Sequence, residues 1–163
     1  MTLADDLLAR NREFAQQSFT GSHPVRPSRG LAIVACMDSR MDMFAMLGLD
    51  SGDAHVLRNA GGVVTDDVIR SLAISQRVLG TSGIVLVHHT DCGMQKLTDD
   101  SFREDLEADT GVRPAFAIES FRDPFEDTRQ SIARLHNSPF LAKKDEIVGF
   151  VYDVDTGLLH LVE

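Results

Sequence analysis

The chain has 163 residues, with 16 Lys and Arg against 25 Asp and Glu, which gives a formal net charge of −9. An acidic chain of this kind argues against nucleic acid as a partner, because neutralising phosphates requires clustered Lys and Arg. No apolar run approaches the ~20 residues that span a bilayer, and the first residues lack the basic start and apolar stretch of a signal peptide. We therefore expect a cytoplasmic protein with no membrane association and with reduced cysteines.

The chain begins with a segment that predicts an isolated helix. Residues 2–19 have helical character, and their apolar side chains tend to one side. Gly21, Pro24 and Pro27 then break the pattern before the first apolar run. This helix is therefore expected to stand apart from the strand that follows it.

The remainder alternates between apolar runs and helical patterns. The run at residues 31–35 has no polar alternation, as is typical of a strand covered on both faces. The next expected elements are a helix over 41–47, a strand over 54–57, a helix from the capping Thr65 to Gly80, a strand over 84–88 and a mixed helical stretch over 93–109. The helix over 41–47 carries a Met-rich cluster that is expected in the core: Met41, Met43, Phe44, Met46 and Leu47. A helical turn over 114–121 follows, then a helix from Asp123 with Ile132, Ala133 and Leu135 toward the core, and a hairpin of 147–152 with 158–162.

This alternation indicates an α/β fold with a mainly parallel central β-sheet, flanking helices and an antiparallel edge strand. We find no repeat, no low-complexity tract and no linker. Residues 1–163 are therefore expected to form a single domain.

Three metal-binding side chains follow two of the expected strands. Cys36 comes directly after the run 31–35, and His89 and Cys92 follow the run 84–87. Groups at the carboxyl ends of neighbouring parallel strands converge on one crevice. Two thiolates and an imidazole suit tetrahedral zinc and leave one open position, because the chain has no further cysteine to close the site. Taken alone, Cys36 would be interpreted as a buried structural thiol; the pattern as a whole predicts a catalytic Zn²⁺, one per chain.

Asp38 and Arg40 form a second informative pair, two and four residues after the first thiol. The carboxylate can reach the open coordination position or hydrogen-bond the bound water, and the Arg fork can hold that carboxylate. If Arg40 releases it, Asp38 can become the fourth ligand and block the site. The alternative is a plain ion pair in a loop.

Together these residues resemble the β-class carbonic anhydrase family. The resemblance rests on Cys36-x-Asp38-x-Arg40, on His89-x-x-Cys92-Gly93 and on the intervening Arg58-Asn59-Ala60-Gly61-Gly62, and it is strongest over residues 31–94. The chain is more similar to the shorter, archaeal-like branch than to the plant-like branch, which places a substrate-binding Gln before the first strand.

The resemblance implies reversible hydration of CO2 to bicarbonate and a proton by a zinc-bound hydroxide. Ionisation of a zinc-bound water near neutral pH is the established behaviour of carbonic anhydrase itself. The family also implies Cys36, His89 and Cys92 as zinc ligands, an Asp38–Arg40 dyad and a homodimer or larger homo-oligomer. Its N-terminal helix embraces the partner subunit, a role that the apolar face of residues 1–20 suits.

Some residues keep two interpretations. Gly61 and Gly62 either make only a turn or bring their backbone close to the substrate pocket. Strand alternation turns His88 away from His89, so it is expected to be packed or at the surface rather than a proton shuttle.

Three other functions remain open. Carbonyl sulfide or carbon disulfide hydrolysis on the same scaffold is the closest alternative. A zinc-stabilised binding module would use the metal only for folding. A thiol redox protein is disfavoured because the two cysteines lack the C-x-x-C arrangement.

Overall fold

A five-stranded sheet forms the centre of the computed structural model, which describes residues Met1 to Glu163. The strand order is β2-β1-β3-β4-β5. The first four strands are parallel and β5 runs antiparallel to β4, as the sequence predicts. The strands are β1 (Leu31–Cys36), β2 (Ala54–Asn59), β3 (Gly83–His89), β4 (Ile147–Tyr152) and β5 (Leu159–Val162).

The chain also forms five α-helices, and none is both long enough and apolar enough to cross a membrane. They are α1 (Leu3–Gln17), α2 (Met43–Leu47), α3 (Asp66–Arg77), α4 (Asp99–Thr110) and α5 (Pro124–Asn137). Two short 3-10 helices, Ala60–Gly62 and Gly93–Lys96, follow β2 and β3. Thr65 caps α3 as expected, since its side chain accepts a hydrogen bond from the backbone of Val68.

The apolar core lies on both faces of the central strands. On β1, Ala32 and Val34 pack with residues of α3 and α5, whereas Ile33 and Ala35 pack on the opposite side with Met43 of α2. Strand alternation sends successive side chains to opposite faces, and both faces are covered here. That is why the sequence of β1 shows no polar alternation.

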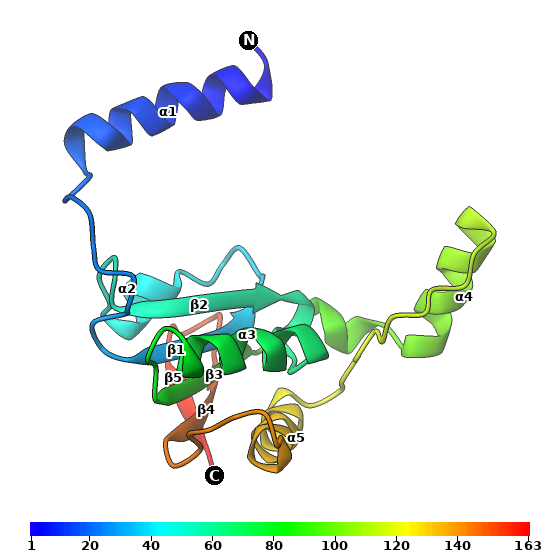
Figure 1. The fold of residues 1–163 in the computed structure, drawn as a ribbon. Coiled ribbons are helices and arrows are strands. Elements are labelled where there is room, and N and C mark those ends of the chain that lie inside the picture. Colours follow the sequence, from blue (N-terminus) through cyan, green and yellow to red (C-terminus); the bar gives the residue numbers. More distant parts are fainter.

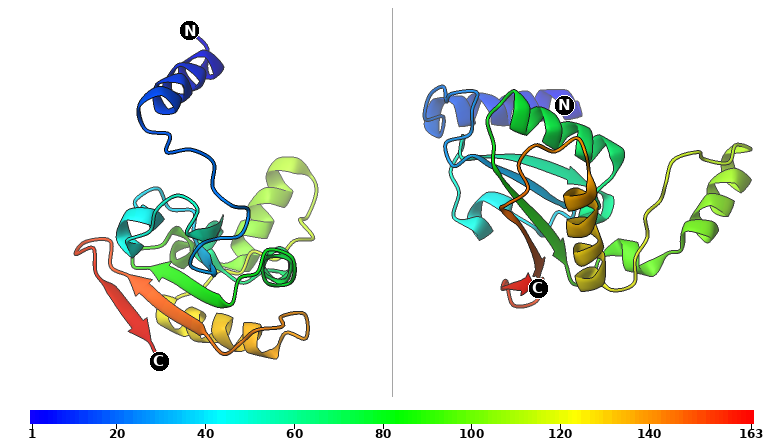
Figure 2. Two further views of the ribbon diagram at one scale, coloured as in Figure 1. Left: turned by 60° about the vertical axis from the view of Figure 1, so that its left-hand side comes forward. Right: turned by 60° about the horizontal axis from the view of Figure 1, so that its bottom comes forward.

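Two helices extend from this body rather than packing onto it. Figures 1 and 2 show α1 standing away from the sheet and α4 projecting from another side. Neither helix contains a buried residue. On α1 the apolar side chains of Leu3, Leu7, Leu8 and Phe14 are all exposed. Both helices thus keep surfaces that this chain does not cover.

Three predictions about local structure are wrong. Residues 114–121 form an irregular segment rather than a helical turn, because Asp99 at the start of α4 accepts hydrogen bonds from the backbone and hydroxyl groups of Ser120. Ala133 is exposed; Thr128, Ser131 and Leu135 form the buried side of α5. In the Met-rich cluster, Phe44 is exposed, because Asp42 caps α2 and sets a helix start two residues later than expected.

Candidate metal centre

The candidate site lies where β1 and β3 end, side by side in the sheet. Cys36 is the last residue of β1 and His89 is the last residue of β3. The chain then turns through Asp91, whose φ of 51° is left-handed, and brings Cys92 to the start of the next 3-10 helix. The predicted convergence of the three side chains at one edge of the sheet is therefore observed.

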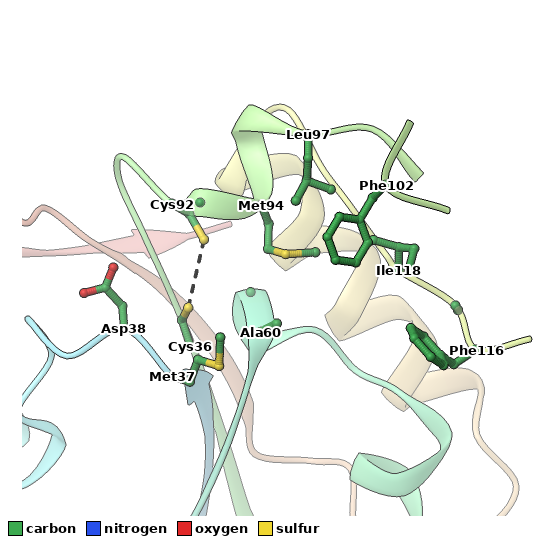
Figure 3. Close-up of a pocket in the computed structure, with 13 residues that line it drawn as sticks. Cys36, Met37, Asp38, Ala60, Cys92, Met94, Leu97, Phe102, Phe116 and Ile118 are labelled. Carbon is green, nitrogen blue, oxygen red and sulfur yellow. Dashed lines mark hydrogen bonds between the residues drawn. The ribbon is translucent and has the colours of Figure 1, made fainter. Parts of the chain in front are cut away.

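The three side chains form a compact, buried cluster that could hold a metal ion. Their ligand atoms all lie within 4.8 Å of one another. The Sγ atoms of Cys36 and Cys92 are 3.9 Å apart, as the dashed line in Figure 3 marks. Two thiolates at the usual Zn–S distance of about 2.3 Å, at a tetrahedral angle, would be separated by about 3.8 Å. The spacing of the sulfur atoms therefore fits zinc.

The imidazole of His89 is also oriented as a ligand. Its Nδ1–H group donates a hydrogen bond to the carbonyl oxygen of Thr90 at 2.8 Å. Its Nε2 atom is buried and has no hydrogen-bond partner. A backbone carbonyl on one ring nitrogen fixes the tautomer that leaves the other nitrogen free to bind a metal. An unpartnered lone pair in a dry site is costly unless an ion occupies it.

The two thiols do not ionise alike in the metal-free chain. The hydrogen bond from the Cys92 thiol to the Cys36 sulfur lowers the pKa of Cys36 to about 4, although burial acts in the opposite direction. A hydrogen bond from the backbone amide of Gly61 lowers this pKa further. The same contact and burial raise the pKa of Cys92. Burial alone would lower the pKa of His89, but the neighbouring Cys36 sulfur raises it. The hydrogen bond between the two sulfur atoms therefore favours thiolate on Cys36 and thiol on Cys92.

Asp38 and Arg40 pair as the sequence predicts. Arg40 donates from Nε to Oδ1 of Asp38 at 3.0 Å and from Nη2 to Oδ2 at 2.8 Å. The backbone amide of Arg40 also donates to Oδ1. These donors hold the pKa of Asp38 well below its usual range, mainly through the Arg40 side chain. Oδ2 lies 3.7 Å from Nε2 of His89, so the carboxylate faces the three candidate ligands while it is paired with Arg40.

Arg40 has a second set of partners that sequence reasoning missed. Its Nη1 atom donates to Oδ2 of Asp91 at 3.0 Å, and its Nη2 atom donates to the Asp91 carbonyl oxygen at 3.0 Å. Lys96 pairs with the other oxygen of the same carboxylate at 2.7 Å. The sequence did contain a signal for this contact, because Asp91 lies between His89 and Cys92. An acidic side chain at that position is close to any basic residue that lies beside the three candidate ligands.

The two glycines after β2 bring their backbone to the site. Gly61 and Gly62 have φ values of 83° and 72°, and both are buried. A Cβ atom on Gly62 would lie 2.7 Å from the backbone nitrogen of Cys36. Gly61 lines the pocket beside the cluster, whereas Gly62 lies against the backbone of β1 and does not line it. A part for either glycine in binding substrate stays a prediction.

A mostly apolar pocket of about 570 Å³ opens beside the cluster (Figure 3). One side is formed by Cys36, Asp38, Gly61 and Cys92. The rest is formed by apolar side chains from the 3-10 helix after β3, from α4 and from the irregular segment: Met94, Leu97, Phe102, Phe116 and Ile118. A pocket of this kind suits a small apolar molecule delivered to a polar reactive corner.

His88 lies on the other side of β3, as strand alternation predicts. It is completely buried, and its Nε2 atom is 2.6 Å from Oδ2 of Asp127 on α5. Its ring packs against Phe121 with centroids 5.4 Å apart. His88 is therefore a packed residue outside the metal cluster.

Comparison with known proteins gives consistent matches. The family model described as "Carbonic anhydrase" matches residues 31–117. Beta-carbonic anhydrase 1 of Mycobacterium tuberculosis is 55% identical over 162 residues, covering 99% of both chains. A carbon disulfide hydrolase of Acidianus sp. is 33% identical over 177 residues, covering 93% of this chain and 85% of that protein. The crystal structure of a carbonic anhydrase from Streptococcus mutans superposes with a TM-score of 0.93 at 46% identity, covering 100% of this chain and 99% of the other.

Proposed function

The chain belongs to the β-carbonic anhydrase family, and we propose that it catalyses the reversible hydration of CO2 to bicarbonate and a proton, with zinc as its metal. The observation that carries the proposal is the cluster of Cys36, His89 and Cys92, with its unpartnered Nε2 atom, at the reactive corner of an apolar pocket. This activity makes the protein a lyase, a carbonate dehydratase.

The proposed ligands are Sγ of Cys36, Nε2 of His89 and Sγ of Cys92. When bound there, zinc supplies a Lewis acid that ionises a water molecule near neutral pH, the behaviour established for carbonic anhydrase. Two thiolates and a neutral imidazole balance the charge of the ion and leave one coordination position for chemistry.

Asp38 orients the nucleophile in this proposal. Its Oδ2 atom faces the cluster at 3.7 Å from Nε2 of His89, so it can accept a hydrogen bond from a water molecule in the corner between them. Because Arg40 keeps the carboxylate ionised, Asp38 remains an acceptor across the working pH range. Release from Arg40 would free Asp38 to become a fourth ligand, which is the blocked state.

The remaining groups shape the substrate site. The backbone of Gly61 forms part of one wall beside Cys36, and apolar side chains such as Met94 and Ile118 form the other. CO2 is small and has no net dipole, so an apolar wall accommodates it without desolvating a buried polar group.

Hydrolysis of carbonyl sulfide or carbon disulfide is the alternative on the same scaffold. The similarity favours CO2, because the carbonic anhydrase of M. tuberculosis is 55% identical whereas the carbon disulfide hydrolase of Acidianus is 33% identical.

We also propose a cytoplasmic homodimer or a larger homo-oligomer. The support is the exposed apolar face of α1, on which Leu7 and Leu8 are each 55% exposed. A helix without buried residues has little stability in water by itself, so packing of this face against a second subunit would stabilise it. Reduced thiols, which the metal site requires, are maintained in the cytoplasm.

Stopped-flow measurement of CO2 hydration on zinc-quantified protein tests the function. We expect activity in proportion to bound zinc, rising from neutral to alkaline pH as the water ionises. The matched control is Cys92→Ala, which removes a ligand at the same corner. Zinc-loaded protein without hydratase activity, or with hydrolysis of carbon disulfide in its place, would overturn the proposal.

A further inference from the structure

One arginine binds three backbone carbonyls of the loop that carries the candidate dyad. Arg58, near the end of β2, donates from Nε to the carbonyl oxygen of Cys36 at 2.8 Å and from Nη2 to that of Asp38 at 2.6 Å. Its Nη1 atom donates to the carbonyl oxygen of Met41 at 3.1 Å. A single side chain thus spans the loop from the first thiol to its far end.

The other hydrogen bonds of this loop are local or lie at its start. After Cys36 it leaves β1, the backbone amide of Met37 donates to the carbonyl oxygen of Asn59, and the backbone amide of Met41 donates to the carbonyl oxygen of Asp38. Arg40 binds the Asp38 carboxylate but none of the carbonyl oxygens that Arg58 binds. At its far end, Met41 is anchored in the core. Between these two points the loop must present both the Cys36 sulfur and the Asp38 carboxylate to the same corner.

The planar guanidinium group suits this task. Its donors diverge in one plane with fixed angles, so three carbonyls bound to it are fixed relative to one another. An ammonium group offers donors from a single point on a flexible stem and cannot reproduce that spacing. The carbonyls also need partners, since an unsatisfied backbone acceptor next to a buried site is costly.

We propose that Arg58 is a positioning residue for the metal centre. It fixes the backbone of residues 36–41, and through it the direction of the Cys36 sulfur and the Asp38 carboxylate toward the metal. Arg58 does not touch substrate or metal in this role. The inference rests on the proposed zinc site. It adds to that site a residue that is neither a proposed metal ligand nor a member of the Asp38–Arg40 pair.

The test compares Arg58→Ala and Arg58→Lys with Arg77→Ala. Arg77 is a matched control, because it also donates two side-chain hydrogen bonds to a backbone carbonyl, that of Phe140, away from the site. Four quantities are measured on each purified full-length protein: zinc affinity by competition with a chromophoric chelator, kcat and KM for CO2 hydration, and the thermal unfolding midpoint.

We expect Arg58→Ala to lose about 10- to 100-fold in kcat and a similar factor in zinc affinity, the range seen when the partners of metal ligands are removed. KM should stay near the wild-type value, because the apolar pocket wall is untouched. Arg58→Lys should show most of the same loss. Arg77→Ala should keep zinc affinity and kcat.

Wild-type zinc affinity and kcat in both Arg58 variants would overturn the inference, even if their unfolding midpoints fell, since that result describes a merely structural residue. If Arg58→Ala does not fold, Arg58→Lys decides between the two outcomes. If the wild-type protein binds zinc but does not hydrate CO2, the proposed function fails, and the zinc affinities still decide the role of Arg58.

Discussion

Replacing Gly62 with Ala tests how tightly the glycine loop is fitted to the metal centre. The added Cβ atom would lie 2.7 Å from the backbone nitrogen of Cys36 and 2.9 Å from the carbonyl carbon of Ala35. Both atoms belong to β1, which is held between β2 and β3 and cannot move freely. The substitution also forces a side chain onto a φ of 72°.

The two effects have separate magnitudes. A left-handed conformation costs a residue with a Cβ atom about 1–2 kcal/mol. Overpacking against fixed neighbours costs about a further 1–3 kcal/mol. Gly62→Ala should therefore lower the free energy of unfolding by about 2–5 kcal/mol. Because the strain acts on the backbone of Cys36, zinc affinity should fall as well.

Gly48→Ala is the matched control, because Gly48 has a φ of 60° but no atom within 4 Å of an added Cβ. Gly48→Ala should lower the free energy of unfolding only by the cost of the left-handed backbone conformation. Urea unfolding of the metal-free proteins measures both free energies, and chelator competition measures the zinc affinities. Equal destabilisation of the two variants, with unchanged zinc affinity in Gly62→Ala, would refute the claim that the loop is fitted closely against Cys36.

The metal ligands and their neighbours give the remaining predictions. Cys36→Ala should contain no zinc by elemental analysis, and full occupancy would refute the ligand set. Arg40→Ala should keep zinc but lose about 10- to 100-fold of the hydration rate in stopped-flow assays; near-normal turnover with Asp38 unmoved in a crystal structure would refute the dyad. Zinc binding to the metal-free protein should release protons and weaken as the pH falls, because the pKa of Cys92 is raised and zinc must displace its proton. Calorimetry in buffers of different ionisation enthalpy measures this release, and a binding enthalpy that does not depend on the buffer would contradict it. Removal of residues 1–20 should convert a dimer into a monomer by light scattering, and a full-length monomer would contradict the assigned role of α1.

The sheet and the metal cluster could be predicted because both follow from local sequence. The apolar runs identify β1 and β3, and a rule about parallel sheets then places Cys36 beside His89. The same holds for Asp38 and Arg40, which are two residues apart and meet without help from the rest of the fold. Short separations and strand ends are therefore well predicted.

The surroundings of the cluster could not be predicted in the same way. Arg58 reaches the loop after β1 across 17 to 22 residues of sequence, and Asp91 reaches Arg40 across 51. The sequence pattern of residues 114–121 does not indicate that Ser120 hydrogen-bonds Asp99. Phe116 and Ile118 of the same segment nevertheless line the pocket. Contacts of this kind depend on the register of elements that are far apart, and a single sequence does not contain that information.

Charge around the site differs from the charge of the chain as a whole. In a protein of net charge −9, two thiolates and the carboxylates of Asp38 and Asp91 would make this corner strongly negative and repel bicarbonate. The basic side chains gathered there are Arg40, Arg58 and Lys96. A divalent ion at the thiolates would make the local charge positive, which would favour an anionic product and the ionisation of a bound water molecule. Because Lys96 is 67% exposed, solvent and salt weaken its part, whereas the ion acts in a buried site where screening is small. A divalent ion held by the two thiolates would therefore decide the sign of the field at the reactive corner, and Arg40 and Lys96 offset the charges of Asp38 and Asp91.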